Sequence, residues 1–200
     1  MPLGANKVAL YGASADTGSA VLLSTATASS SASIEFTLPT AYKQVTFGLY
    51  NVTPSSNDIY IQWQVSTGSG YSTTITSNSF MAYQNEGGTV TSLGYRTSED
   101  QAQGTGYQDI GGSVGNGSER SGAITLTLYN PASTTYVKNW YSRAVSINGD
   151  TRNPGAGQYP YMLDSHCAGY WNTTSALTSA SFKFESGNIA SGTIKMWGIK

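Results

Sequence analysis

Residues 111–115 (GGSVG) match the G-x-S-x-G pattern, in which a sharp turn presents a nucleophilic serine beside an oxyanion hole. The pattern works only between a buried hydrophobic strand and a helix. Here residues 107–110 (YQDI) do not form a hydrophobic strand, and residues 116–118 (NGS) do not favour a helix. A chance match is expected in a chain with 23 glycines. We therefore interpret the segment as a flexible loop without a catalytic serine.

Asp164, Ser165 and His166 are the three residue types of a hydrolase triad, and His166 is the only histidine. In an extended segment Asp164 and His166 point to one side and Ser165 to the other, so they cannot form a relay among themselves. Their apolar neighbours indicate a half-buried strand. Cys167 is the only cysteine, which excludes a disulfide within the chain and a cysteine-based zinc site. We expect no catalytic residue, metal site or cofactor here.

Paired carboxylates are the remaining enzymatic option, because glycosidases place two acids around the bond that they cleave. Glu99 and Asp100 are the adjacent pair among eleven acidic residues, and their polar surroundings indicate a solvated loop. Glycan-cleaving depolymerases are usually long β-helices with repeated turns, whereas this sequence has no repeat of fixed period. A glycan-cleaving hydrolase is therefore the least favoured function, and we expect that the protein is not an enzyme.

Aromatic and amide side chains near the expected loops suit sugar binding, because flat rings stack on the C–H faces of sugars. The candidate glycan-binding residues are Tyr107, Tyr159 and Trp171 as stacking surfaces, with Asn153 and Gln158 as hydrogen-bonding partners. The alternative is that these large rings fill the core and subunit interfaces, where aromatic residues are enriched. Both interpretations remain open from the sequence.

The composition limits the class of partner. Only 10% of the residues are charged and the net charge is −1, while Ser and Thr make up about a quarter of the chain. The basic residues are scattered, so we expect no nucleic-acid partner. No apolar run approaches the roughly 18 residues of a membrane span. The first residues do not resemble a signal peptide, so synthesis in the cytoplasm is expected.

Alternation of apolar and polar residues predicts most of the strands. The clearest segments are residues 32–38, 45–49, 59–65, 124–128, 136–147, 182–185 and 193–199. The last two are expected to form a terminal hairpin, with Ile194 and Met196 facing the core. Residues 84–122 show weak strands at best, and residues 148–160 form a long loop in this interpretation.

The expected fold is all-β, an antiparallel β-sandwich or jelly roll at residues 31–200, preceded by an N-terminal docking arm at residues 1–30. Such a sandwich, with few charges and exposed strand edges, is prone to aggregation. Burial of these edges against identical subunits would remove the hazard, and a closed ring is the usual symmetric solution. We therefore expect the protein to form a homotrimer.

The two ends of the chain carry a resemblance. Residues 186–200 (SGNIASGTIKMWGIK) resemble the closing strand of many tailed-bacteriophage virion proteins, which often end in a phrase like SGTIxLYGIK. The likeness covers about fifteen residues, and Met196 and Trp197 stand where that phrase usually has an aliphatic residue and tyrosine. Residues 1–10 (MPLGANKVAL) look like the start of the same class.

The resemblance implies a non-enzymatic structural protein on the outside of a phage particle, as a short tail-fibre or tail-tip protein or as a head decoration or spike. Its partners would be copies of itself, other virion proteins bound through the N-terminal arm, and a glycan of the host surface. The alternative from another class is a stand-alone, lectin-like glycan-binding module.

Overall fold

A computed structural model describes residues 19–149 and 159–200. These residues form thirteen β-strands and no helix. The strands are β1 (Val21–Thr27), β2 (Ile34–Thr37), β3 (Gln44–Pro54), β4 (Ile59–Ser66), β5 (Ile75–Asn85), β6 (Thr91–Tyr95), β7 (Ala102–Gly104), β8 (Gln108–Val114), β9 (Gly122–Tyr129), β10 (Lys138–Ile147), β11 (Tyr161–Trp171), β12 (Ser179–Phe184) and β13 (Ile189–Ile199). The described residues therefore include no helix that is long and apolar enough to cross a membrane.

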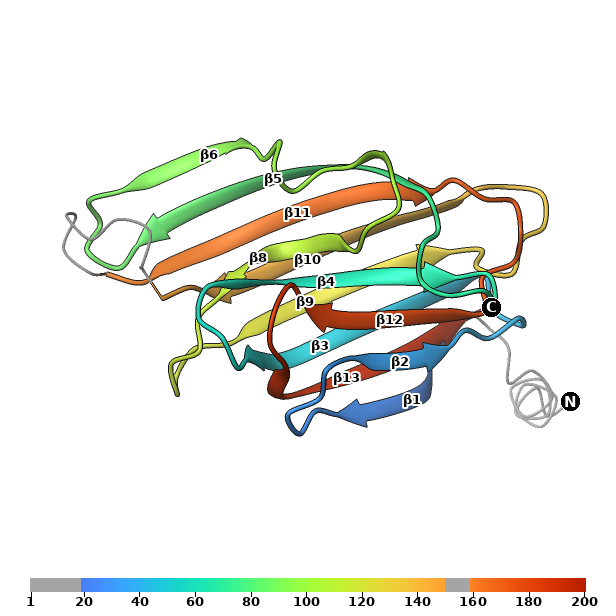
Figure 1. The fold of residues 1–200 in the computed structure, drawn as a ribbon, viewed down its shortest axis with the longest axis horizontal. Coiled ribbons are helices and arrows are strands. Elements are labelled where there is room, and N and C mark those ends of the chain that lie inside the picture. Colours follow the sequence, from blue (N-terminus) through green and yellow to red (C-terminus); the bar gives the residue numbers. More distant parts are fainter. Residues whose placement is uncertain (1–18, 150–158) are drawn as a thin grey trace, which may run out of the picture.

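Two antiparallel sheets pack face to face (Figure 1). The larger sheet has the order β1-β13-β3-β9-β10-β11-β5-β6, with β7 paired to β5, and the smaller sheet has the order β2-β12-β4-β8. This arrangement confirms the predicted all-β sandwich. The larger sheet continues through β5 and β6, beyond the edge of the smaller sheet at β8 (Figure 1).

The C-terminal strand β13 lies inside the larger sheet, between β1 and β3. Ile194 and Met196 point into the core and are 0% and 4% exposed, as the alternation predicted. The predicted terminal hairpin is wrong, because β12 pairs with β2 and β4 in the smaller sheet. The turn before β13 therefore carries the chain from one sheet to the other, with Gly187 at a φ of 71°.

The core between the sheets is filled by aromatic and branched side chains from both layers. Trp63 of β4 lies 5.2 Å from Trp140 of β10 and 5.1 Å from Trp171 of β11, measured between ring centroids. Phe182 of β12 packs against Phe47 of β3 at 5.0 Å. Rings that meet edge to face in this way join the two sheets by burial and by ring–ring attraction.

The sandwich begins earlier than the sequence indicated. Strand β1 belongs to the arm expected at residues 1–30, yet it pairs with β13 as the edge of the larger sheet, and Ala28 is buried in the core. Residues 1–18 lie outside the described residues.

The polar stretch at residues 84–122 contains regular strands, which corrects the expectation of a largely irregular segment. Within it, β6 and β7 both pair with β5, and β8 pairs with β4. Their Ser, Gly, Asn and Gln residues hide the usual alternation.

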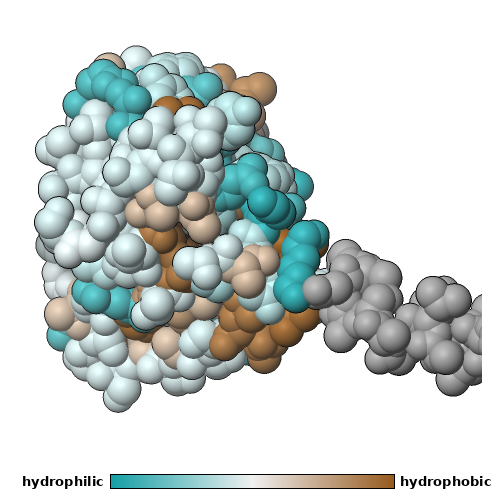
Figure 2. Space-filling model, turned by 90° about the vertical axis from the view of Figure 1, so that its right-hand side faces the viewer, coloured by the Kyte–Doolittle hydropathy of each residue, from teal (hydrophilic) through white to brown (hydrophobic). Residues whose placement is uncertain are grey.

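The surface reflects the low charge content. Figure 2 shows one end of the sandwich, where pale residues of intermediate hydropathy cover most of the surface, with scattered hydrophilic groups and a limited hydrophobic patch. Hydroxyl and amide groups thus provide most of the hydration at this end.

Candidate functional site

The segment with triad residue types lies in β11 and has the geometry expected of a strand. Asp164 and His166 point outward and are 3.4 Å apart between Oδ1 and Nε2, while Ser165 points inward and is fully buried. Arg143 of β10 binds both carboxylate oxygens of Asp164, at 3.2 and 3.0 Å. This hydrogen bond lowers the pKa of Asp164. Ser165 is therefore separated from the other two by the sheet.

The G-x-S-x-G segment is part of β8, not the flexible loop that we expected. A Cβ atom on Gly111 would lie 2.6 Å from Ala144, and one on Gly112 would lie 2.6 Å from Leu163. The glycines therefore allow β8 to approach the larger sheet closely. The backbone carbonyl of Ser113 accepts a hydrogen bond from Ser146 of β10 at 3.1 Å. The motif thus serves packing between the sheets and does not form a nucleophile elbow.

Glu99 is buried, which corrects the expectation of a solvated loop for the pair with Asp100. Its carboxylate accepts hydrogen bonds from Arg96 Nε at 2.9 Å and from Ser79 Oγ at 3.2 Å. Burial lowers the pKa of Arg96, but the hydrogen bond and charge of Glu99 more than offset this and raise it. Arg96 therefore compensates the charge of the buried Glu99.

Asp109 of β8 is the carboxylate with the most altered acidity. Burial raises its pKa to about 7, although Gln62 donates a hydrogen bond to it at 2.8 Å. The nearby charges of Glu99 and Glu185 raise it further. A buried carboxyl without a neighbouring cation favours its neutral form.

The single cysteine and a buried lysine are both held within the packed interior. Burial raises the pKa of Cys167 to about 11, so its sulfur remains a thiol at neutral pH. The buried Lys138 donates to the backbone carbonyls of Thr173 and Ser175, at 3.0 and 2.6 Å. Across residues 19–149 and 159–200, no three His, Cys, Asp or Glu side chains gather as metal ligands.

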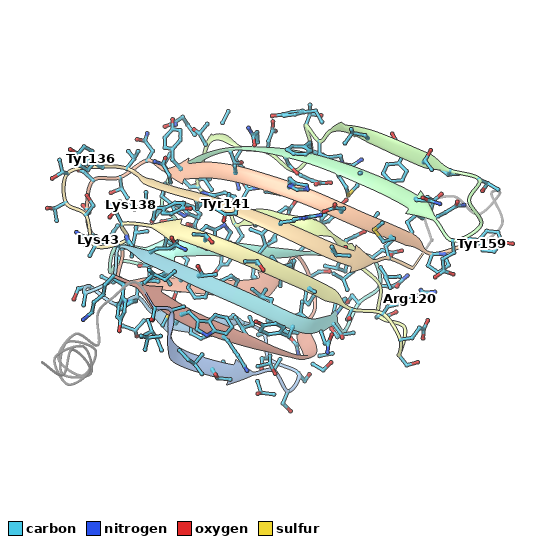
Figure 3. All side chains as sticks on the ribbon, turned by 180° about the vertical axis from the view of Figure 1, so that it is seen from behind. Lys43, Arg120, Tyr136, Lys138, Tyr141 and Tyr159 are labelled. Carbon is cyan, nitrogen blue, oxygen red and sulfur yellow. The ribbon has the colours of Figure 1, made fainter. Side chains whose placement is uncertain are left out.

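The three candidate stacking residues, which all lie in the described part of the chain, have different surroundings. Trp171 is fully buried in the core, so it presents no stacking surface to a ligand. Tyr107 donates its hydroxyl to Ser181, and Lys183 covers its ring at 4.7 Å. Tyr159 is 46% exposed and lies at one end of the sandwich, away from Tyr136 at the other end (Figure 3).

Asn153 and Gln158 lie outside the described residues, so their position relative to Tyr159 stays a prediction.

The outward side of the larger sheet, which we call the outer face, is a further surface feature, and Figure 3 views it directly. Twelve large hydrophobic side chains are exposed in the described part of the chain, and nine belong to this face by strand register. They are Leu22, Tyr50, Phe80, Leu93, Tyr95, Tyr129, Tyr141, Val145 and Met162. Single exposed apolar residues are ordinary, but a gathered set marks an interaction surface.

Register explains why these residues share one side. Strand β10 alternates regularly, with Trp140, Ser142 and Ala144 buried and the residues between them exposed. Tyr141 pairs with Thr127 of β9 and with Ala168 of β11. Outward residues of neighbouring strands therefore form rows across the sheet. In Figure 3, Tyr141 lies near the middle of this face.

The rings on the outer face form small clusters. Tyr129 and Tyr141 lie 6.3 Å apart between ring centroids, as do Tyr50 and Trp197. Phe80 stacks on His166 at 4.9 Å, with an angle of 2° between the ring planes. Such contacts hold the rings in place before any partner binds, which reduces the entropy lost on association.

The outer face carries few charges, and two of them neutralise each other. Arg143 and Asp164 form the bidentate pair described above, so their burial against a partner would leave no uncompensated charge. Lys195 lies 5.9 Å from the centre of the Tyr50 ring. This face is therefore suited to an uncharged partner surface.

A separate cavity of about 230 Å³ lies beside the edge of the smaller sheet. It is lined by Tyr60, Met81, Tyr83, Val90, Arg96, Ser113, Asn148, Tyr161 and Leu163. The strands β5 and β11 contribute from the larger sheet, and β4 and β8 from the smaller one. The sequence does not reveal this cavity, because its residues come from separate segments of the chain that only the strand pairing brings together.

Comparison of the chain with protein-family models, with curated proteins and with solved structures gives no match.

Proposed function

We propose that this protein is a non-enzymatic structural protein on the outside of a tailed-phage virion, where it assembles with copies of itself through the outer face. The observation that carries the proposal is the concentration of exposed rings and aliphatic side chains on one side of the larger sheet. Because only 10% of the residues are charged, there is little electrostatic repulsion between copies to oppose contact through this surface.

A second copy of the same chain is the occupant that fits this face best. The surface carries few charges, and those of Arg143 and Asp164 compensate each other. It therefore needs no oppositely charged partner, and an identical neutral surface satisfies it. In a closed ring of three, one part of the outer face of each copy would contact a different part of this face on the next copy, which leaves no open contact that could extend into a fibre.

The resemblance of residues 186–200 to the closing strand of phage virion proteins supports the virion part of the proposal. In this chain that segment includes β13, which pairs on both sides and places Ile194 and Met196 in the core. Both a tail position, in a short fibre or tail tip, and a head position, as a decoration protein, agree with such a compact sandwich. Other virion proteins would bind the N-terminal arm.

Mass spectrometry of particles from the lysate of a host that carries this gene tests the proposal. The wild-type protein should be present in stoichiometric amounts after gradient purification. The double variant Phe80→Glu, Tyr141→Glu should be lost from particles, while the control Tyr136→Glu, at an exposed position on a loop, should be retained. Absence of the wild-type protein from purified particles would refute the virion role.

A further inference from the structure

The cavity at the edge of the smaller sheet has the composition of a ligand site. Two of its tyrosines, Tyr83 and Tyr161, stand at 74° to each other with 5.7 Å between ring centroids. Tyr60 lines the cavity from β4, in the smaller sheet. Met81 and Leu163, which are 5% and 4% exposed, provide an apolar floor. An apolar pocket with a few convergent polar groups is the usual form of a small-molecule site.

The polar groups of the cavity are held in place by other residues. Arg96 is fixed by its ion pair with Glu99 at 2.9 Å and by a hydrogen bond with Tyr60. Asn148 exchanges two hydrogen bonds with Tyr161: each backbone N–H donates to the other residue, at 3.1 Å in both cases. These contacts position donors and acceptors before a ligand arrives, which reduces the cost of binding.

The size and charge of the cavity restrict the ligand. A volume of about 230 Å³ is below the roughly 300–1,000 Å³ of sites for drug-sized molecules, so one ring of a sugar fits better than a longer segment. Glu99 compensates the charge of Arg96, so the cavity offers no excess positive charge to a carboxylate. Tyrosine rings match the C–H faces of a sugar, and their hydroxyls match its hydroxyl groups.

We propose that this cavity binds a single uncharged hexose unit, such as the terminal residue of a neutral surface polysaccharide. Tyr83 and Tyr161 provide the stacking surfaces, and Arg96 and Asn148 hold the hydroxyl groups. The lining residues named here come from one chain, so binding does not depend on the proposed assembly. This site is not the one that the sequence suggested, since Tyr107, Tyr159 and Trp171 do not line the cavity.

Saturation-transfer NMR and calorimetry with glucose, galactose, N-acetylglucosamine and glucuronic acid test this inference. At least one neutral sugar should bind with a dissociation constant in the millimolar range or tighter, and glucuronic acid should bind at least ten-fold more weakly. Tyr83→Ala should reduce binding at least ten-fold, whereas Tyr83→Phe should keep most of it because the ring remains. Tyr141→Ala on the outer face is the matched control and should bind like wild type.

The variant Val90→Trp provides a test that leaves the tyrosines in place, because it fills the cavity from its lining. It should abolish sugar binding with an unchanged far-UV circular dichroism spectrum. The inference is overturned if none of the sugars binds, if glucuronic acid binds best, or if Val90→Trp binds sugar like wild type. Because Phe80→Glu, Tyr141→Glu should bind sugar normally even as a monomer, failure of this inference is separate from failure of the assembly role.

Discussion

The half-buried carboxyl of Asp109 leads to a prediction about how stability depends on pH. Its pKa in the folded protein is about 7, against an ordinary value of 3.8, so the folded state binds this proton more tightly than the unfolded state. Stability is then lost as pH rises from about 4 to about 7, since the unfolded chain releases the proton first. The difference between the two pKa values corresponds to about 4 kcal/mol. That is a large part of the 5–15 kcal/mol typical of a whole domain.

The substitution Asp109→Asn removes the titration and keeps an oxygen that can accept the hydrogen bond from Gln62. Urea unfolding at pH 4.5, 6 and 8 should show that the variant gains stability relative to wild type as pH rises, by up to about 4 kcal/mol at pH 8. Glu119→Gln, at an exposed side chain, is the control and should follow the wild-type curve above pH 5. Parallel curves for wild type and Asp109→Asn would refute the burial of this carboxyl.

Three further predictions concern the fold. Deletion of residues 193–200 removes the buried Ile194 and Met196, each worth about 1.5–3 kcal/mol, and should abolish soluble folded protein, whereas an unchanged melting temperature would contradict the position of β13. Gly112→Val should cost about 1–3 kcal/mol in chemical unfolding because its side chain meets Leu163, while Gly94→Val, with open space around it, should cost much less; equal costs would argue against close packing of β8. Trp171→Ala should cost about 3–5 kcal/mol and Tyr159→Ala less than about 0.5 kcal/mol by the same assay, and a reversed order would mean that Trp171 is not in the core.

Much of the fold could be predicted where the strands alternate regularly. The residues of β4, β9 and β10 reveal their buried side directly, because apolar and polar positions take turns. The prediction failed for β8, since close packing against β10 and β11 requires Gly111 and Gly112 where a typical strand has branched residues. It also failed for the last turn, because alternation shows which side of a strand is buried but not which strand lies beside it.

The candidate site could not be fully predicted either, because it also depends on which strands lie side by side. The exposed positions of β10, such as Tyr141 and Val145, could be assigned to one side from the sequence alone. That Phe80, Leu93 and Met162 share this side follows only from the register of β5, β6 and β11. Prediction of the cavity also requires the packing of the two sheets, because its wall includes Tyr60 of the smaller sheet and Tyr83 and Tyr161 of the larger one.

The mass of the protein in solution tests the role of the outer face most directly. Sedimentation equilibrium at micromolar concentration should give three chains of 21.1 kDa, about 63 kDa, for wild type and for the loop variant Tyr136→Glu. Phe80→Glu, Tyr141→Glu should sediment as a folded monomer of 21.1 kDa, because a charge at each position opposes burial of the face. A wild-type monomer, or a double variant that still forms trimers, would contradict assembly through the outer face.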